Sequence, residues 1–174
     1  MKVEVPGPIE IKGPWNLKFT PGWGVCENVT FDSLICWNKC TDFNICHYSG
    51  AATYSNIIQI GKEMLTNNNK FILDLDKVYN MAVVKINCSD SITVWEEPYC
   101  TDITDCLKAG ENKLEITVIN SWANRIIGDL NLPESQRKTS IKNFPVYKKD
   151  SPLVESGLEG NVKIHVIVCR EIKP

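Results

Sequence analysis

The stretch Lys113-Leu-Glu-Ile-Thr-Val-Ile-Asn120 alternates polar and apolar side chains from Lys113 to Val118. A second stretch, Val162-Lys-Ile-His-Val-Ile-Val-Cys169, has the same period of two over most of its length. Successive side chains of a β-strand point to opposite faces, so this pattern is typical of strands with one face in a core and one toward solvent. Both stretches therefore predict strands of a sheet that is covered on one side.

Shorter stretches with strand character occur through much of the chain. They cover residues 9–12, 15–20, 53–60, 71–75 and 81–87. Turn-forming residues separate them, as in Asn67-Asn-Asn69 and Ala109-Gly-Glu-Asn112. About seven to nine short strands with such turns predict an all-β fold, a sandwich of two antiparallel sheets.

Little helix is expected. Residues 102–108 predict one turn closed by Gly110, and residues 122–130 predict a second, irregular turn. Residues 133–156 are mostly polar and contain three prolines, at 133, 145 and 152, so they predict a long surface loop. Since common domains have roughly 100–150 residues, residues 1–174 predict a single domain with an ordered core from about residue 10 to 170.

Composition narrows the class of protein. The 174 residues carry a formal net charge of −2, with 43% hydrophobic and 23% charged residues, which is typical of a soluble globular chain. The near-neutral balance gives no electrostatic reason to expect nucleic acid or an anionic membrane surface as a partner. No apolar run approaches the roughly 18 residues of a membrane-spanning helix. The N-terminus lacks a secretory apolar run, which predicts a cytosolic protein or a piece of a longer chain.

Eight cysteines form the other compositional feature, at positions 26, 36, 40, 46, 88, 100, 106 and 169. The run Cys36-x3-Cys40-x5-Cys46-His47 suggests zinc, but only its first two cysteines have the spacing of a structural zinc pair. We therefore expect mostly buried free thiols, which behave as small hydrophobic groups. Cys88 and Cys169 fit this expectation best, because each ends an apolar strand.

Three motifs occur in a fixed order along the chain. Residues 48–54 match Y-x-G-x-[AG]-x-Y, and residues 94–99 contain a W-x-x-P-[YF] loop. Residues 102–120 match D-[IV]-T-x-x-[IL]-x-x-G-x-N-x-[IL]-x-[IV]-x-[IV]-x-N. Together they resemble the jelly-roll sugar-binding domain of family 2 glycoside hydrolases, except that the loop before Trp95 lacks the usual glycines. In the third motif, Gly110 suits a left-handed backbone and Asn112 can close the turn before the strand.

Further motifs narrow the resemblance. The first is Gly13-Pro-Trp-Asn-Leu-Lys-Phe19, together with residues 29–34 and Trp37. The second is N-x-W-x-N-R-[LI]-I-G-D at residues 120–129, and the third is S-P-L-x-x-S-G-L-x-G at residues 151–160. Over about residues 10–170 the chain resembles the C-terminal β-sandwich of the bacterial α-L-rhamnosidases of glycoside hydrolase family 106.

The resemblance implies a galactose-binding-domain-like jelly roll that serves a glycoside hydrolase as an accessory domain. Its expected partners are a rhamnose- or galactose-containing glycan and a catalytic barrel elsewhere in the parent protein. Such a bacterial glycan-degrading enzyme would be periplasmic or extracellular. A purely structural domain without sugar affinity, or one that lends rim residues to a hydrolase active site, is the alternative.

Exposed aromatic residues on loops are how sandwich domains usually hold sugars. The predicted carbohydrate-binding residues are Trp95, Tyr99, Trp122, Asn124, Arg125 and Asp129. Architecture or domain packing is the alternative for residues 122–125, and Arg125 with Asp129 has the i, i+4 spacing of an ion pair. Trp15 and Trp37 are expected in the core, and His47 as a structural histidine. Sugar binding predicts exposed Trp95 and Trp122 beside a groove, whereas packing predicts them in a flat apolar patch.

The sequence supports a catalytic site or a metal site less well than it supports a carbohydrate-binding site. Glu96 and Glu97 are adjacent, but neighbours point apart in an extended chain, whereas an inverting glycosidase needs two facing carboxyl groups. We therefore expect no catalytic residue and no cofactor. A structural Ca²⁺ is the open alternative, because Asp102, Asp105 and Asp129 offer the oxygen ligands that it prefers.

Overall fold

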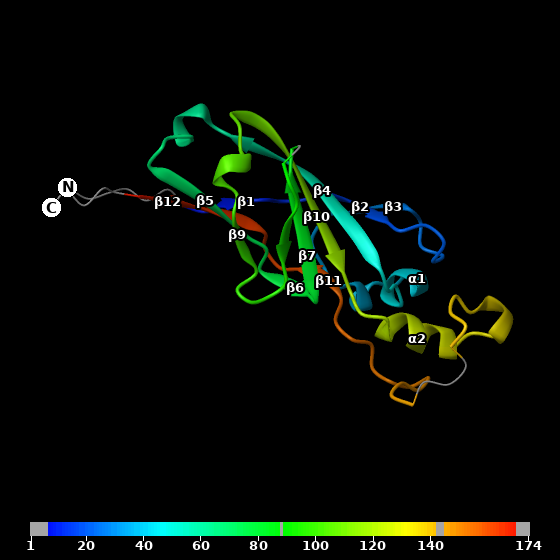
Figure 1. The fold of residues 1–174 in the computed structure, drawn as a ribbon. Helices are drawn as coiled ribbons and strands as arrows, with labels where there is room; N and C mark the ends of the chain where they lie inside the picture. The colour runs from blue at the N-terminus through cyan, green and yellow to red at the C-terminus, as the bar shows by residue number, and fades with distance from the viewer. Residues whose placement is uncertain (1–6, 88, 142–144, 170–174) are drawn as a thin grey trace.

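Two antiparallel sheets face each other across one hydrophobic core in the computed structural model, which describes residues 7–87, 89–141 and 145–169 (Figure 1). The six-stranded sheet has the order β3 (Asn28–Phe31), β2 (Trp15–Phe19), β4 (Ala51–Ile60), β10 (Gly110–Ile119), β7 (Met81–Ile86), β8 (Ile92–Val94). The four-stranded sheet has the order β1 (Ile9–Glu10), β12 (Lys163–Val168), β5 (Asn69–Asp74), β9 (Cys100–Asp102). A two-stranded ribbon joins β11 (Gly157–Glu159) to β6 (Lys77–Tyr79). The predicted all-β sandwich of two antiparallel sheets is confirmed.

The two alternating stretches form interior strands of the two sheets, β10 in the six-stranded sheet and β12 in the four-stranded sheet. β10 pairs with β4 along ten residues and with β7 along six. Leu114, Ile116 and Val118 are fully buried, as is Ile164 in the opposite sheet. The described residues form twelve strands rather than the seven to nine predicted, because five of them have only two or three residues. Such short strands are too brief to show a period in sequence.

The two α-helices of the described residues are short and lie at one end of the sandwich (Figure 1). They are α1 (Phe43–Cys46) and α2 (Ala123–Leu130), with 3-10 turns at Trp37–Lys39, Lys62–Met64, Thr104–Cys106 and Glu134–Gln136. The turn predicted at 102–108 is confirmed. The irregular turn predicted at 122–130 is instead an eight-residue α-helix. Between α2 and β11 the described residues contain no strand, and their one helical element is the 3-10 turn Glu134–Gln136.

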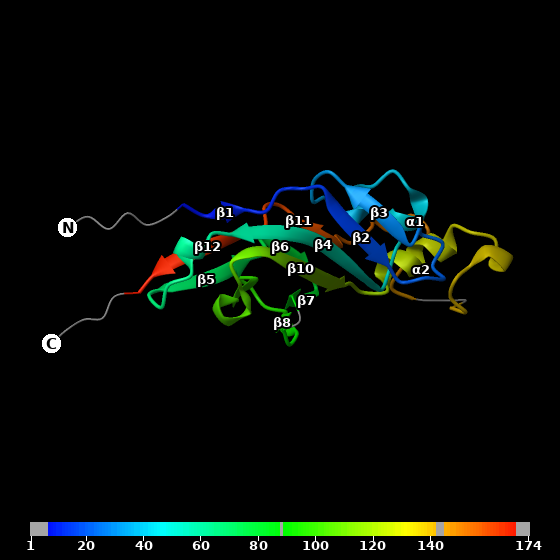
Figure 2. The ribbon, with the colours of Figure 1, turned by 90° about the horizontal axis from the view of Figure 1, so that it is seen from above.

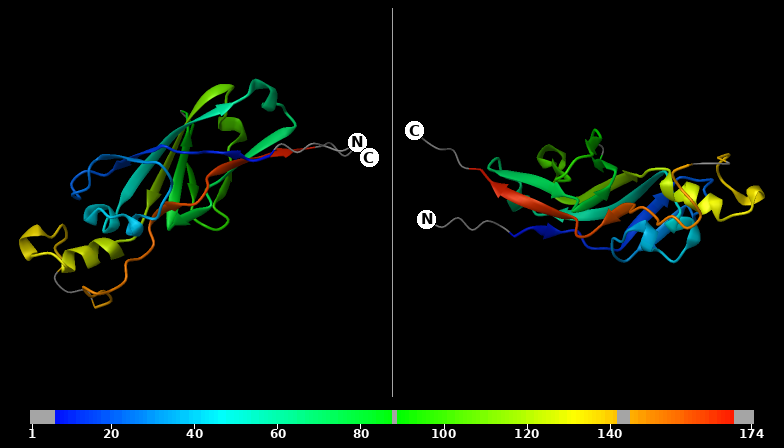
Figure 3. Two further views of the ribbon diagram at one scale, coloured as in Figure 1. Left: turned by 180° about the vertical axis from the view of Figure 1, so that it is seen from behind. Right: turned by 90° about the horizontal axis from the view of Figure 1, so that it is seen from below.

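The first and last strands lie away from α2. β1 and β12 are paired neighbours, with Ile9 opposite Ile164. Figures 2 and 3 show these two strands running toward one end of the molecule while α2 and the segment after it project from the other. No helix of the described residues is long and apolar enough to cross a membrane.

Trp15 and Trp37 are both buried, as predicted. The Trp37 indole lies parallel to the Tyr54 ring at a centroid distance of 6.4 Å and donates a hydrogen bond of 2.6 Å to the Tyr54 hydroxyl. Tyr48 contacts Trp37 edge to face at 5.5 Å. The first motif thus supplies core aromatics at this end of the sandwich.

The cysteine expectation is wrong for most positions. Among the described cysteines Cys36 alone is buried, four are partly exposed, and Cys26 and Cys169 are exposed. Cys169 lies outside the core because β12 ends at Val168. Cys88 lies outside the described residues.

Candidate functional site

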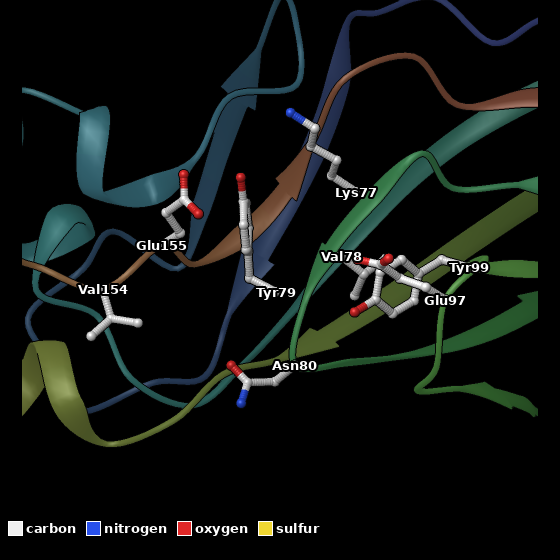
Figure 4. Close-up of a pocket in the computed structure, with 8 residues that line it drawn as sticks. All are labelled: Lys77, Val78, Tyr79, Asn80, Glu97, Tyr99, Val154 and Glu155. Carbon is white, nitrogen blue, oxygen red and sulfur yellow. The ribbon is translucent and has the colours of Figure 1, made fainter.

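A groove of about 460 Å³ opens beside the β6–β11 ribbon, a volume in the range of small-ligand sites. It is lined by Lys77, Val78, Tyr79, Asn80, Glu97, Tyr99, Val154 and Glu155. Figure 4 shows Glu97 and Tyr99 on one side of Tyr79 and Val154 and Glu155 on the other. Three separate chain segments therefore meet here, the ribbon strand, the loop before β9 and the segment before β11.

Tyr79 is held in place by a hydrogen bond to an ion pair. Its hydroxyl donates a hydrogen bond of 2.6 Å to Glu159 Oε2, and Lys39 forms an ion pair with the same carboxylate. Burial and the hydrogen bond to Glu159 raise the pKa of Tyr79, so its hydroxyl stays neutral. Hydrogen bonds from Lys39 and Tyr79 lower the pKa of Glu159. The Tyr79 ring is thereby fixed as part of the groove wall.

Two predicted sugar residues lie in the loop that forms one side of this groove. Tyr99 is a lining residue and is partly buried. Trp95 is 68% exposed and lies four residues before it, immediately after β8. An indole this exposed contributes little to the core, since it leaves most of its apolar surface in water. Tyr99 therefore lines the groove, and Trp95 lies on the same loop without lining it.

Asn124 forms hydrogen bonds that fix Val154, a residue on the opposite side of the groove. Its Nδ2 donates to the Val154 carbonyl at 2.7 Å, and its Oδ1 accepts from the Val154 N–H at 2.8 Å. A further contact of 3.3 Å reaches Ser156 Oγ. Asn124 is only 2% exposed. It therefore positions Val154 in the groove wall rather than presenting its own amide to solvent.

Arg125 and Asp129 form a buried ion pair inside α2. Arg125 Nη2 lies 2.9 Å from Asp129 Oδ1, and the two side chains are 1% and 2% exposed. Within the described residues, Arg125 Nε and Nη2 have no well-aligned hydrogen-bond acceptor. Asp129 also accepts hydrogen bonds from the Lys138 N–H, the Thr139 N–H and the Thr139 hydroxyl. The pair thus braces the segment after α2.

Trp122 lies at the start of α2 and is 52% exposed. Its ring contacts that of Trp23 edge to face, with 5.3 Å between the centroids. Trp23 is an aromatic residue that the sequence analysis does not single out, because it stands alone in a loop with no motif around it. Of the six predicted sugar residues, Trp95, Tyr99 and Trp122 thus have exposed surface, whereas Asn124, Arg125 and Asp129 are interior.

The predicted calcium ligands do not come together. Asp102 accepts hydrogen bonds from Thr104 and pairs with Lys70, and Asp129 is occupied by donors from its own segment. The described part of the chain contains no cluster of three His, Cys, Asp or Glu side chains suited to a metal ion. The zinc spacing at Cys36–Cys46 therefore has no structural counterpart among these residues.

Cys46 and His47 make a thiol–imidazole contact of 3.1 Å, yet the geometry does not activate the thiol. His47 Nδ1 also lies 2.8 Å from the Phe43 carbonyl, so this nitrogen donates to that carbonyl and cannot accept a proton from Cys46. Burial raises the pKa of Cys46 and lowers that of His47. His47 has a structural role, as predicted.

Asn124→Ala tests the clamp on the groove wall. Because both hydrogen bonds to Val154 are lost, we expect the Val154 amide to exchange with solvent at least about tenfold faster, a cost of roughly 1–3 kcal/mol. Hydrogen exchange followed by NMR measures this directly. Asn131→Ala is the matched control, since it removes a hydrogen bond to Lys149 farther along the same segment. Unchanged Val154 exchange would contradict the assigned role.

No family model matches the sequence. A putative β-glucuronidase from Formosa agariphila is 36% identical over 190 residues, an alignment that covers 97% of this chain and 16% of that protein. A rhamnosidase structure from Novosphingobium sp. PP1Y aligns with a TM-score of 0.83 and 31% identity over 95% of this chain and 16% of its own. The β-D-glucuronidase from Dictyoglomus thermophilum aligns with a TM-score of 0.64 and 15% identity, over 97% of this chain and 29% of its own. The chain is thus similar to one domain of much larger glycoside hydrolases and spans about a sixth of the first two.

Proposed function

We propose that this chain is a non-catalytic domain of a larger glycoside hydrolase and contacts carbohydrate through the groove lined by Tyr79 and Tyr99. The observation that carries the proposal is this groove itself, which joins two aromatic residues to polar side chains in a fold shared with glycoside hydrolases. The catalytic carboxyl groups would lie on another domain of the parent protein.

The groove has the chemistry that a sugar needs. An aromatic ring can pack on the apolar C–H face of a pyranose, while polar groups bond to its hydroxyls. Asn80, Glu97 and Glu155 supply acceptors and a donor, and Lys77 supplies a cationic donor. A rhamnose- or galactose-containing glycan is the proposed ligand, because the relative with the 0.83 TM-score is a rhamnosidase.

Packing against a parent catalytic domain is the second candidate. It is favoured by the short span of the chain relative to its relatives, since most of such a protein lies outside this domain. In this account the groove or the exposed indoles would be covered by protein. The two candidates differ in whether the isolated chain has measurable sugar affinity.

Tryptophan fluorescence separates these candidates. Titration with L-rhamnose, D-galactose or a rhamnose-containing pectic oligosaccharide should give a saturable change reported by Trp95, which lies two residues before the lining residue Glu97. Tyr99→Ala should weaken binding about tenfold, because loss of one aromatic contact costs on the order of 1.4 kcal/mol. Trp122→Ala is the control, since Trp122 is not a lining residue of the groove.

The outcomes are distinct. Saturation that Tyr99→Ala weakens and Trp122→Ala preserves would support the groove. No saturable change with any of the three ligands at tens of millimolar would sink the sugar-binding proposal and favour packing.

A further inference from the structure

Three non-glycine residues of the described chain have a left-handed backbone. They are Asp76 with φ 61°, Asn80 with φ 86° and Asn87 with φ 54°. Asparagine and aspartate tolerate this region better than most residues, but glycine adopts it without steric cost. A side chain at such a position therefore points to a role that glycine could not fill.

Two of the three side chains hold other parts of the backbone in place. Asp76 Oδ2 accepts a hydrogen bond of 2.9 Å from the Asn161 N–H. Asn87 Nδ2 donates to the Cys106 carbonyl at 3.0 Å, and its Oδ1 accepts from the Lys113 N–H at 3.1 Å. Glycine at either position would lose these bonds, so the fold itself explains both residues.

Asn80 has no such structural role. Its side chain is exposed and, among the residues that the structure describes, forms no hydrogen bond. It lines the groove together with Tyr79, although successive side chains of a continuous strand point to opposite faces (Figure 4). The positive φ lies between the end of β6 at Tyr79 and the start of β7 at Met81, where it interrupts this alternation. The backbone is therefore bent at the residue that brings a free amide to the groove.

We propose that Asn80 orients the sugar in the groove, an inference that rests on the proposed function, and that its amide bonds to two neighbouring hydroxyl groups of the ring. Among the described side chains that line the groove, Asn80 alone carries a donor and an acceptor in one planar amide. The lysine there only donates, and the two carboxylates only accept. The Tyr79 hydroxyl is already bonded to Glu159. The ligand class is thus a pyranose with two adjacent free hydroxyl groups.

Two asparagine-to-glycine variants test this role, because glycine keeps the left-handed backbone and removes the amide. Tryptophan fluorescence should show that Asn80→Gly weakens binding of methyl α-L-rhamnoside or methyl β-D-galactoside at least about threefold. Its midpoint of urea unfolding should equal or exceed that of the wild type, since relief of backbone strain offsets the greater freedom of the unfolded chain.

Asn87→Gly is the matched control, with the same substitution in the same backbone region. It should lower the urea midpoint, because the bonds to Cys106 and Lys113 are lost, and it should leave sugar affinity unchanged. The two variants are therefore expected to have opposite effects on stability and on binding.

A 3-deoxy ligand tests the contact itself. Every pair of neighbouring ring hydroxyls in either methyl glycoside includes the hydroxyl on C3. The wild type should therefore bind the 3-deoxy analogue at least about threefold more weakly than the parent sugar, whereas Asn80→Gly should bind the two within about twofold of each other.

The outcomes distinguish the role of Asn80 from the sugar site as a whole. Saturable binding that Asn80→Gly leaves unchanged, or full discrimination against the 3-deoxy ligand in that variant, would overturn the role of Asn80 alone. A lower urea midpoint in Asn80→Gly would assign the residue to the fold instead. No saturable binding to the wild type at tens of millimolar sugar would overturn both the groove and this role.

Discussion

Replacing Asp129 by Asn should lower the free energy of unfolding by about 3–5 kcal/mol, because it leaves the Arg125 guanidinium as an uncompensated buried charge. The substitution also places an amide group where the carboxylate accepts three donors from Lys138 and Thr139. Urea unfolding followed by circular dichroism measures the change.

Two further variants test whether the buried ion pair is the cause of the lost stability. Asp102→Asn should cost less than about 1 kcal/mol, since its ion pair with Lys70 is exposed. The double variant Arg125→Met/Asp129→Asn should recover part of the stability lost in Asp129→Asn, because it removes the unpaired buried charge and keeps an amide oxygen that can accept from Thr139. If Asp129→Asn cost no more than Asp102→Asn, the buried pair would not be the brace that we describe.

The same carboxylate gives the stability a pH dependence. Burial alone would raise the pKa of Asp129, but hydrogen bonds from Thr139 and Lys138 and the charge of Arg125 lower it overall. A depressed pKa means that the folded state binds the proton less tightly than the unfolded chain. The stabilisation is therefore complete above the unfolded pKa of about 3.9 and is lost as the pH falls through the folded value.

Tyr54→Phe should lower the free energy of unfolding by about 2–4 kcal/mol. The Tyr54 hydroxyl accepts hydrogen bonds from Trp37 Nε1 at 2.6 Å and from the Leu158 N–H at 3.1 Å, and all three residues are buried. Removing one oxygen leaves two buried donors unpaired, at roughly 1–3 kcal/mol each. Urea unfolding measures the loss.

Tyr99→Phe is the matched control for this substitution. It removes a hydroxyl from a partly exposed ring, so we expect a change within about 0.5 kcal/mol. Equal effects of the two substitutions would show that the Trp37–Tyr54 bond does not hold this end of the core together.

The parts of the fold with strong local chemistry could be predicted from the sequence. Gly110 has φ 85°, and Asn112 bonds to the backbone of Lys108 and Gly110, as its place before the long strand predicts. Asn120, the last residue of the same motif, bonds to the backbone of Tyr48 and Gly50. The contacts of Asn112 belong to a local turn and were predicted, whereas those of Asn120 join two distant motifs and were not.

The groove could not be predicted in this way. Tyr79, Tyr99 and Glu155 are brought together by sheet pairing between distant strands, and no local pattern marks them as neighbours. Asn124, Arg125 and Asp129 are polar, and so they appear in sequence as surface residues. They are buried because the segment after α2 folds back over the helix and supplies their hydrogen-bond partners.

A crystal structure of the chain soaked with L-rhamnose or D-galactose is the most direct test of the central claim, that the groove beside the β6–β11 ribbon contacts sugar. The account predicts a sugar ring packed on Tyr99 or Tyr79, with its hydroxyls within hydrogen-bond distance of Asn80, Glu97 or Glu155. A ring bound elsewhere, or an empty groove in crystals whose solution titration shows saturation, would contradict it.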